Sequence, residues 1–371
     1  MALYNEDVIY KRNLGMLALL YIPLIVLAKI VRWTIMKPQL VDVSIGWYMV
    51  NDLNNGNFEP FAFNQNNSMA FYDFVNFCGL TNYIEWEWFI TVALNVIVFI
   101  VACNFYRNNR GATFTDSIFI YLNIAILNIF CFCMAKEPPQ MLCFLIMSIA
   151  ILAPKSISAK RVAIAFALLF TAFFMRKYYG LVLIYLFAVE FAISSWLSKI
   201  DVSTAEGKRK IALSVLGLLL LFACFQYVLL TIMAGVDPET YMEMIRVNNR
   251  EGSNAASEIA PIFATENRAL FCVDYFIKIF RLMFPVELLL KGKVTYIFIV
   301  VYHAMLFGYL YKSFVNFKQL TDNHKYALYL YIAFWLCSAS FEPDFGSWIR
   351  HEGVAFPVII LLLSKTRKQL V

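Results

Sequence analysis

Ten apolar runs limit what this chain can fold into. A helix needs about 20 apolar residues to cross a bilayer, and most of the runs reach or approach that length. Charged residues make up only 15% of the 371 residues, whereas a soluble domain carries about 25%. The sequence therefore predicts an all-α, polytopic transmembrane bundle of about ten spans, with residues 1–371 as one integral membrane domain. The runs are Leu14–Trp33, Trp88–Cys103, Ile118–Ala135, Met141–Leu152, Val162–Phe174, Tyr178–Leu197, Ile211–Ala234, Val294–Tyr311, Tyr326–Ala339 and Val354–Leu363.

Three of the runs, Met141–Leu152, Val162–Phe174 and Val354–Leu363, are shorter than a spanning helix. The first two are neighbours and could form a re-entrant pair instead of two full spans. Either arrangement leaves the segments before and after them on the same sides of the membrane.

The basic residues of the short loops orient the chain, because cytoplasmic loops are enriched in Lys and Arg. With the N-terminus inside, the cytoplasmic segments hold more than half of the 31 Lys and Arg. The short outside connections hold only Lys136, Arg176, Lys177 and Arg350. We therefore expect a multi-pass protein of the cytoplasmic membrane with both termini in the cytoplasm.

Two long loops fall on the extracytoplasmic side, at residues 34–87 and 235–293. Loops of this length are usually functional. The second is predicted to contain a helix over Pro238–Asn249 and an amphipathic helix over Glu266–Met283, which Pro285 ends. The apolar face of the amphipathic helix, predicted to lie on the membrane, consists of Phe271, Phe276, Ile279 and Phe280.

The segment Ser340–Gly353 places three carboxylates, a guanidinium and an imidazole between two apolar runs. Glu342 and Asp344 could orient a sugar hydroxyl or take its proton. Arg350 could hold a phosphate oxygen, and His351 could act as a general base. The alternative is an interfacial turn in which Arg350 extends to the membrane surface and pairs with a neighbouring glutamate.

Two further outside connections carry charge next to apolar runs. In Lys136-Glu137-Pro138-Pro139, the two prolines predict an extended exit from the third run. The charged pair before them is either an ordinary interfacial ion pair or part of a site. In Arg176-Lys177-Tyr178-Tyr179, adjacent cations at membrane depth favour function, and the tyrosines either stack on sugars or belong to an aromatic belt.

The second long loop holds more arginines than salt bridges within it would use. Arg246 and Arg250 are four residues apart and would share a helix face. Asp274, Lys278 and Arg281 share a face of the amphipathic helix, where a solvated helix with internal salt bridges is the alternative. The remaining arginine of this loop is Arg268.

Four other residues are weaker candidates for a functional site. The first long loop offers Asp42 and Asp52, but no adjacent pair of carboxylates, so no metal site is predicted there. Glu190, inside the sixth run, is either a core carboxylate paired with another helix or a functional group. His303, on an apolar run, is interpreted as a core histidine whose hydrogen bonds are satisfied.

These features together suit an anionic, lipid-anchored sugar. The sequence contains neither G-x-x-x-x-G-K-[ST] nor G-x-G-x-x-G, nor H-E-x-x-H nor G-x-S-x-G. Nucleotide hydrolysis, zinc proteolysis and nucleophile-elbow ester hydrolysis are therefore not indicated. Outside the cytoplasm a glycosyl donor must carry its own leaving group, and a polyprenyl phosphate or pyrophosphate supplies one whose departing charge arginines stabilise.

Four motifs carry a resemblance to a known family: Lys136-Glu137-Pro138, Arg176-x-Tyr178-Tyr179, Arg281-Leu-Met-Phe-Pro285 and Arg350-His351. They resemble the Wzy-type oligosaccharide repeat-unit polymerases of bacterial O-antigen and capsule clusters. The resemblance covers most of the chain in layout, but only through short motifs. It implies a metal-independent, GT-C-like membrane glycosyltransferase of the bacterial cytoplasmic (inner) membrane.

The resemblance implies transfer of a growing glycan from undecaprenyl pyrophosphate onto the incoming lipid-linked repeat unit. The implied partners are this lipid-linked oligosaccharide and membrane lipid, with a flippase and a chain-length regulator as candidates; neither a cofactor, a metal nor nucleic acid is expected. The residues expected to bind substrate or pyrophosphate are Arg176, Arg250, Arg281, Arg350, Lys136 and Tyr179. The residues expected to act as catalytic base are His351, Asp344 and Glu342.

Two alternatives stay open. A GT-C transferase could use a polyprenyl-phosphate sugar donor with Asp42 as base. A lipid-linked oligosaccharide flippase or transporter would instead use charges within its spans, for which the candidates are Lys29, Glu190 and His303.

Overall fold

The computed structural model describes residues 2–36, 83–133, 136–195, 199–200, 204–234, 257–259, 262–263, 268–340, 342 and 344–363. Over these residues the chain is helical and contains no strand; a single isolated bridge joins Glu258 to Asp344. The all-α class predicted from the sequence is therefore confirmed. The chain divides into two compact units, each described by itself. Unit 1 comprises Met1–Gly180 and Ile349–Lys365, and unit 2 comprises Leu181–Trp348.

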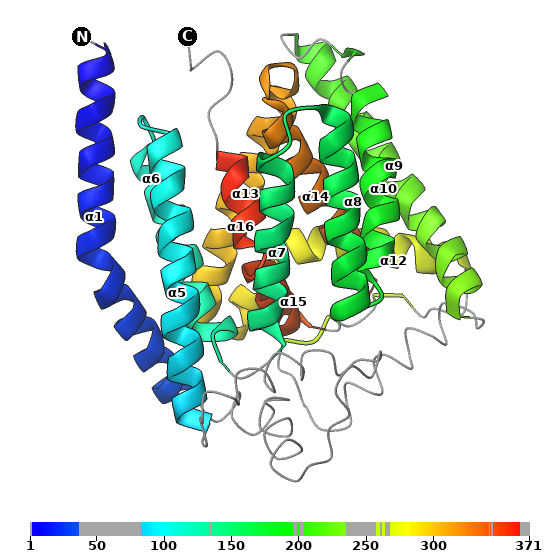
Figure 1. Ribbon diagram of the computed structural model, residues 1–371. Coiled ribbons are helices and arrows are strands. Elements are labelled where there is room, and N and C mark those ends of the chain that lie inside the picture. Colours follow the sequence, from blue (N-terminus) through cyan, green and yellow to red (C-terminus); the bar gives the residue numbers. More distant parts are fainter. Residues whose placement is uncertain are drawn as a thin grey trace. The chain divides into compact units, whose positions relative to one another are not determined.

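Unit 1 is built from helices that precede residue 180 and from the last helices of the described chain. Within it, α1 packs against α5 and α6, and α7 packs against α8 and α16 (Figure 1). Two of its helices end in π-helical turns, η1 after α1 and η2 after α6. The elements are α1 (Ala2–Val31), η1 (Arg32–Met36), α5 (Tyr83–Asn108), α6 (Phe114–Ile126), η2 (Leu127–Cys131), α7 (Glu137–Leu152), α8 (Ile157–Phe174), α16 (Phe356–Ile359) and η6 (Ile360–Leu363).

Unit 2 is organised around α14, whose side chains are all buried from Tyr326 to Ser338. A helix that is buried all round forms the core of its unit. The α12 backbone accepts hydrogen bonds from α14, where Trp335 Nε1 donates to the Ile279 carbonyl over 3.1 Å. The elements are α9 (Tyr179–Ser195), α10 (Ala205–Ala234), α12 (Arg268–Met283), η4 (Val286–Lys291), α13 (Val294–Val315), η5 (Phe317–Gln319) and α14 (Asp322–Ser338). The helix α15 (Phe345–Gly353) starts in unit 2 and ends in unit 1.

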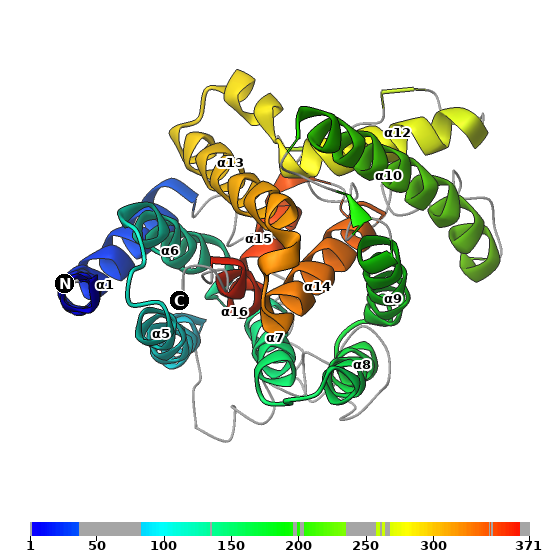
Figure 2. The ribbon, with the colours of Figure 1, turned by 90° about the horizontal axis from the view of Figure 1, so that it is seen from above.

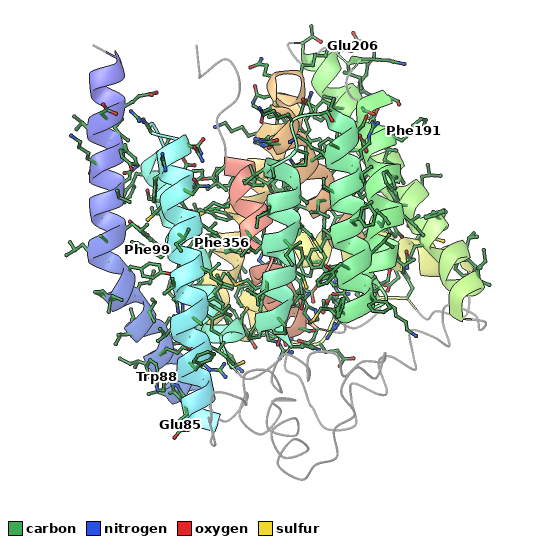
Figure 3. The ribbon with its side chains drawn as sticks, viewed as in Figure 1. Glu85, Trp88, Phe99, Phe191, Glu206 and Phe356 are labelled. Atoms are coloured by element: carbon green, nitrogen blue, oxygen red, sulfur yellow. The ribbon has the colours of Figure 1, made fainter. Side chains whose placement is uncertain are left out.

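Six helices of the described chain are long and apolar enough to cross a membrane. They lie within α1, α5, α6 with η2, α8, α10 and α13, and the pair α15–α16, bent by 62°, would make a seventh. Large apolar side chains on these helices are exposed, among them Leu19, which is 74% exposed. The shorter α9 exposes Phe191 to the same extent (Figure 3). Apolar surface on this scale requires a lipid environment. The protein is thus membrane-embedded, while the count of ten spans stays a prediction.

Local sequence explains where several helices begin. Thr113 and Asp116 form a reciprocal capping box at the start of α6. Ser156 caps α8 and Thr321 caps α14 through their hydroxyl oxygens.

The two prolines after Glu137 do not produce the extended exit predicted from the sequence. They occupy the first turn of α7, which begins at Glu137. Proline is tolerated there because the first-turn N–H groups have no intrahelical acceptor. The two prolines therefore belong to the start of a helix, and Glu137 is the first residue of α7.

The amphipathic helix predicted over Glu266–Met283 corresponds closely to α12. Its orientation differs from the prediction, because Ile279 is fully buried and Lys278 is only 7% exposed. The predicted polar face therefore packs into unit 2 at Lys278, and Ile279 does not face the membrane. The helix predicted over Pro238–Asn249 lies outside the described residues.

Candidate functional site

One end of unit 1 gathers four basic side chains around a buried carboxylate. We call these residues the Glu137 cluster: Lys136, Glu137, Arg176, Arg350 and His351. The Glu137 side chain is 1% exposed, and Arg350 Nε and His351 Nε2 each lie 3.9 Å from its Oε1. Lys136 and Arg176 are close enough to act electrostatically on the same carboxylate.

The packing of α7 explains why segments far apart in the sequence meet here. This helix packs between α8 and α16 (Figure 2). Arg176 follows the end of α8, in a turn closed by a hydrogen bond from the Tyr179 N–H to the Arg176 carbonyl (3.0 Å). Arg350 and His351 stand in the last turns of α15, immediately before α16. Three separate segments therefore bring their charges to the start of α7.

The cluster holds more positive than negative charge. Burial by itself would raise the pKa of the Glu137 carboxyl, but Arg350, Lys136, His351 and Arg176 outweigh it, so this pKa lies below its usual range. Glu137 is therefore ionised at neutral pH. Among the residues that the structure describes in this cluster, three permanent cations, Lys136, Arg176 and Arg350, act on the single carboxylate of Glu137. Such an excess is suited to an anion with several oxygens, such as a phosphate or pyrophosphate.

Neither oxygen of Glu137 accepts a hydrogen bond from any residue that the structure describes. The two nearest basic atoms, at 3.9 Å, are beyond hydrogen-bond distance. A buried carboxylate ordinarily accepts several hydrogen bonds, because an uncompensated one is costly. The oxygens of Glu137 thus keep their accepting capacity in the middle of the cluster.

The two tyrosines after Arg176 have different surroundings. Tyr179 is fully buried, and Gln140 Nε2 donates to its hydroxyl over 2.5 Å. Tyr178 is only half-buried, stacks on Tyr179 with ring centroids 4.6 Å apart, and lies 5.7 Å from the Arg176 guanidinium carbon. The ring of Tyr178 is therefore partly exposed. Tyr179 was predicted to contact substrate, but it is buried and packs beneath the ring of Tyr178 in this turn.

A second buried carboxylate in unit 1 belongs to an ion triad, which we call the Glu87 triad: Lys29, Arg32 and Glu87. Lys29 Nζ donates to Glu87 Oε1 over 3.1 Å, and Arg32 Nε donates to the same oxygen over 2.7 Å. The two cations also donate to the carbonyls of Phe132 (2.6 Å) and Ile129 (2.9 Å). The triad thus joins α1 and α5 to η2 and the turn that follows it.

The π-helical turn η2 also touches the segment that carries Arg350 and His351. Cys131 Sγ lies 3.4 Å from the Arg350 carbonyl, to which it donates. A Cβ added at Gly353 would lie 3.2 Å from both Cys131 Sγ and Ile126 Cγ2. The absence of a side chain at Gly353 therefore lets the end of α15 approach η2 closely. π-Helical turns such as η2 are frequent at functional sites.

The remaining predicted site residues of the described chain lie in unit 2. Asp344 caps α15: its Oδ1 accepts from the Ser347 N–H (2.9 Å) and from Ser257 Oγ (3.2 Å). Arg281 pairs with Glu287, with 2.9 Å between Nη2 and Oε2.

Glu342 is buried in unit 2, in the electrostatic range of Lys278. Burial lowers the pKa of the Lys278 ammonium to about 8, against the opposing effect of Glu342 and Asp274. Sequence reasoning did not connect Glu342 with Lys278, because they are 64 positions apart and on different elements.

The candidates inside the apolar runs have partners within their own units. Tyr326 donates to Glu190 over 2.6 Å, and His303 Nδ1 lies 2.8 Å from the Ile299 carbonyl. Both agree with core roles. Arg246, Arg250, Asp42 and Asp52 lie outside the described residues.

Fold and cluster together define a class: an all-helical, membrane-embedded protein with a buried, cation-rich cluster at one end of unit 1. No protein-family model, no curated protein and no solved structure matches this chain.

Proposed function

We propose that this protein is a glycosyltransferase that polymerises undecaprenyl-pyrophosphate-linked oligosaccharide repeat units into O-antigen or capsular polysaccharide. The observation that supports it most is the Glu137 cluster, in which Lys136, Arg176 and Arg350 meet from three segments. Three of the four motifs that resemble repeat-unit polymerases contribute to this cluster. The fourth contains Arg281, which belongs to unit 2.

The chemistry of the cluster suits a pyrophosphate leaving group. As the bond to the sugar breaks, negative charge develops on the departing oxygen. Fixed guanidinium and ammonium groups stabilise that charge without reorganisation, and losing one such contact typically costs about 10²–10³ in rate. The partly open ring of Tyr178 could stack on a sugar face beside Arg176.

The proposed location is the bacterial cytoplasmic membrane, with both termini in the cytoplasm. This orientation would put the connection between α6 and α7, the connection between α8 and α9, and the end of α15 outside the cytoplasm. Nucleoside triphosphates and nucleotide sugars are absent there, so a donor with its own lipid pyrophosphate is required. A flippase that delivers the repeat unit and a chain-length regulator are the proposed partners.

The two alternatives have less support. Asp42, on which transfer from a polyprenyl-phosphate sugar depends, lies outside the described residues. The in-span candidates for a flippase, Lys29, Glu190 and His303, all bond within their own units. These bonds agree with structural roles and do not favour charges that move with a transported substrate.

Deletion of the gene tests the proposal. Single lipid-linked repeat units should accumulate and the long-chain glycan ladder should disappear from stained gels. The wild-type gene should restore the ladder, and so should a gene carrying Lys177→Ala, because Lys177 is exposed beside Arg176. A ladder that is unchanged in the deletion strain rejects the proposed function.

A further inference from the structure

The carboxylate of Glu137 has different surroundings from Glu87, Glu190 and Asp344, three other carboxylates that the structure describes. Glu87 is equally buried, and basic side chains donate hydrogen bonds to both of its oxygens, to Oε1 over 2.7 and 3.1 Å and to Oε2 over 3.4 Å. Glu190 accepts from a tyrosine, and Asp344 caps a helix. Among the buried carboxylates that the structure describes, Glu137, 1% exposed, is the one in which both oxygens accept no hydrogen bond, whereas Glu342 and Glu352 each have one such oxygen.

The surroundings of Glu137 keep it ionised without using its lone pairs. Arg350 Nε and His351 Nε2 face the same oxygen from 3.9 Å. This distance preserves most of the Coulomb attraction but is too long for a hydrogen bond. A structural carboxylate would be expected to contact its cations directly, as Glu87 does. Glu137 is instead a buried, charged acceptor whose two oxygens receive no hydrogen bond from the described residues.

We propose that Glu137 is a catalytic residue that accepts the proton of the attacking sugar hydroxyl. The inference rests on the proposed polymerase function and deepens it. In the reaction, the hydroxyl oxygen of the incoming repeat unit bonds to C1 of the donor sugar, and the bond from C1 to the pyrophosphate oxygen breaks with its electron pair. The hydroxyl proton moves to Glu137 Oε1 or Oε2, and undecaprenyl pyrophosphate leaves. Solvent takes the proton from Glu137 after the product has moved on.

This assignment differs from the bases predicted from the sequence. The carboxylate oxygen of Asp344 is already used in capping α15. His351 Nε2 faces Glu137, so His351 is suited to orient the carboxylate and the pyrophosphate beside it. Glu137 is the acceptor that lies among the cations proposed to hold the leaving group, which places base and leaving group in one cluster.

The test uses the full-length protein in lipid nanodiscs and the lipid-linked repeat unit isolated from the deletion strain. Three variants are compared with wild type: Glu137→Gln, Glu137→Asp and the control Glu85→Gln. Glu85 is exposed in the first turn of α5, in the same unit (Figure 3). Polymerisation rate and the Kd for the repeat unit are both measured. A positioning or structural role would change binding, whereas a base acts on turnover.

For Glu137→Gln, we expect kcat to fall about 10²–10⁴-fold while the Kd stays the same or becomes tighter, because a negative charge near the pyrophosphate is removed. Glu137→Asp should lose less, and Glu85→Gln should match wild type. If Glu137→Gln keeps more than a tenth of the wild-type rate, the inference about Glu137 is overturned but the proposed polymerase function is not. Loss of repeat-unit binding by Glu137→Gln has the same consequence.

If Glu137→Gln does not fold, the Glu137→Asp variant tests whether Glu137 is the base. A rate at least tenfold lower with unchanged Kd supports the base, and a wild-type rate overturns it. A wild-type protein that binds the repeat unit but never polymerises it overturns the proposed function and the inference together.

Discussion

Glu87 and Glu137 are buried carboxylates of unit 1 with basic neighbours, and the geometries of the two differ. In the Glu87 triad, Lys29 and Arg32 contact the carboxylate directly and also donate to backbone carbonyls. In the Glu137 cluster the nearest basic atoms stay at 3.9 Å. Direct contact uses up the bonding capacity of the charges and fixes three elements together. Separation leaves the carboxylate oxygens able to accept hydrogen bonds from a ligand. We therefore interpret the Glu87 triad as structural and propose a functional role for the Glu137 cluster.

After Glu137 itself, the largest effect should come from the cations of the cluster. Arg350→Ala and Arg176→Ala should each lower polymerisation about 10²–10³-fold, because each removes a stabilising charge at the leaving group. Midpoints of thermal unfolding in detergent should change little for Arg176→Ala. The comparison is with Lys177→Ala, which should behave as wild type. Equal activity of the Arg176 and Lys177 variants would remove the distinction between cluster and surface.

The next effect is one of stability, in the triad. Glu87→Ala leaves two buried cations without their counter-ion, and breaking a buried ion pair in this way costs about 3–5 kcal/mol. We expect a much lower midpoint of thermal unfolding and poor accumulation in the membrane. Glu85→Ala serves as the control, since its side chain is exposed. A Glu87 variant as stable as wild type would show that the triad does not hold α1, α5 and η2 together.

The pH dependence of thermal stability provides a further test of the charge on Glu137. Burial raises and the surrounding cations lower its pKa, with a net decrease. A carboxyl whose pKa is lower in the folded state contributes stability above its unfolded pKa of about 4.3 and loses it as pH falls through the folded value. Thermal stability should therefore be constant from pH 8 to pH 5 as far as Glu137 is concerned, and fall in more acidic buffer.

The cationic groups that face Glu137 are Lys136, Arg176, Arg350 and His351, and the thiols of Cys131 and Cys133 are also near it. Glu137→Gln should reduce the acid-dependent loss of stability. An identical acid profile for wild type and variant would contradict the lowered pKa.

The smallest effect should come from Asp344. Asp344→Ala removes the cap of α15, which should cost about 1 kcal/mol. Because this carboxylate is used structurally, polymerisation per folded molecule should stay within about threefold of wild type. Unfolding midpoints and polymerisation rates measure both quantities. A loss of activity as large as that expected for Arg350→Ala would return Asp344 to the list of candidate bases.

The sequence was sufficient for the general class of the fold and for part of the cluster. Long apolar runs imply membrane helices whatever their packing, and the basic residues between runs stand out because charge near lipid is costly. Lys136, Arg176, Arg350 and His351 were found in this way, and the structure brings all four to Glu137. Glu137 itself appeared in the sequence only beside Lys136, in a charged pair that was either an ordinary interfacial ion pair or part of a site.

Other features depend on contacts that local patterns do not contain. Arg32 and Glu87 are separated by 55 positions. The residues next to each of them in the sequence therefore do not predict the ion pair. Pro138 and Pro139 suggested an extended segment, because a proline pair ends a helix as readily as it starts one. Asp344 looked catalytic because the start of α15 was not recognised, and a cap cannot be identified without its helix.

Gly353 adds a consequence of another kind. A single methyl group there would press on Cys131 and Ile126, two uncharged neighbours outside the cluster. Since Arg350 and His351 stand one turn or less before it on the same helix, a larger residue at position 353 should displace them relative to Glu137. Enlarging that position stepwise would change the distances within the Glu137 cluster without altering any charge or hydrogen-bonding group, and would show how the proposed activity depends on them.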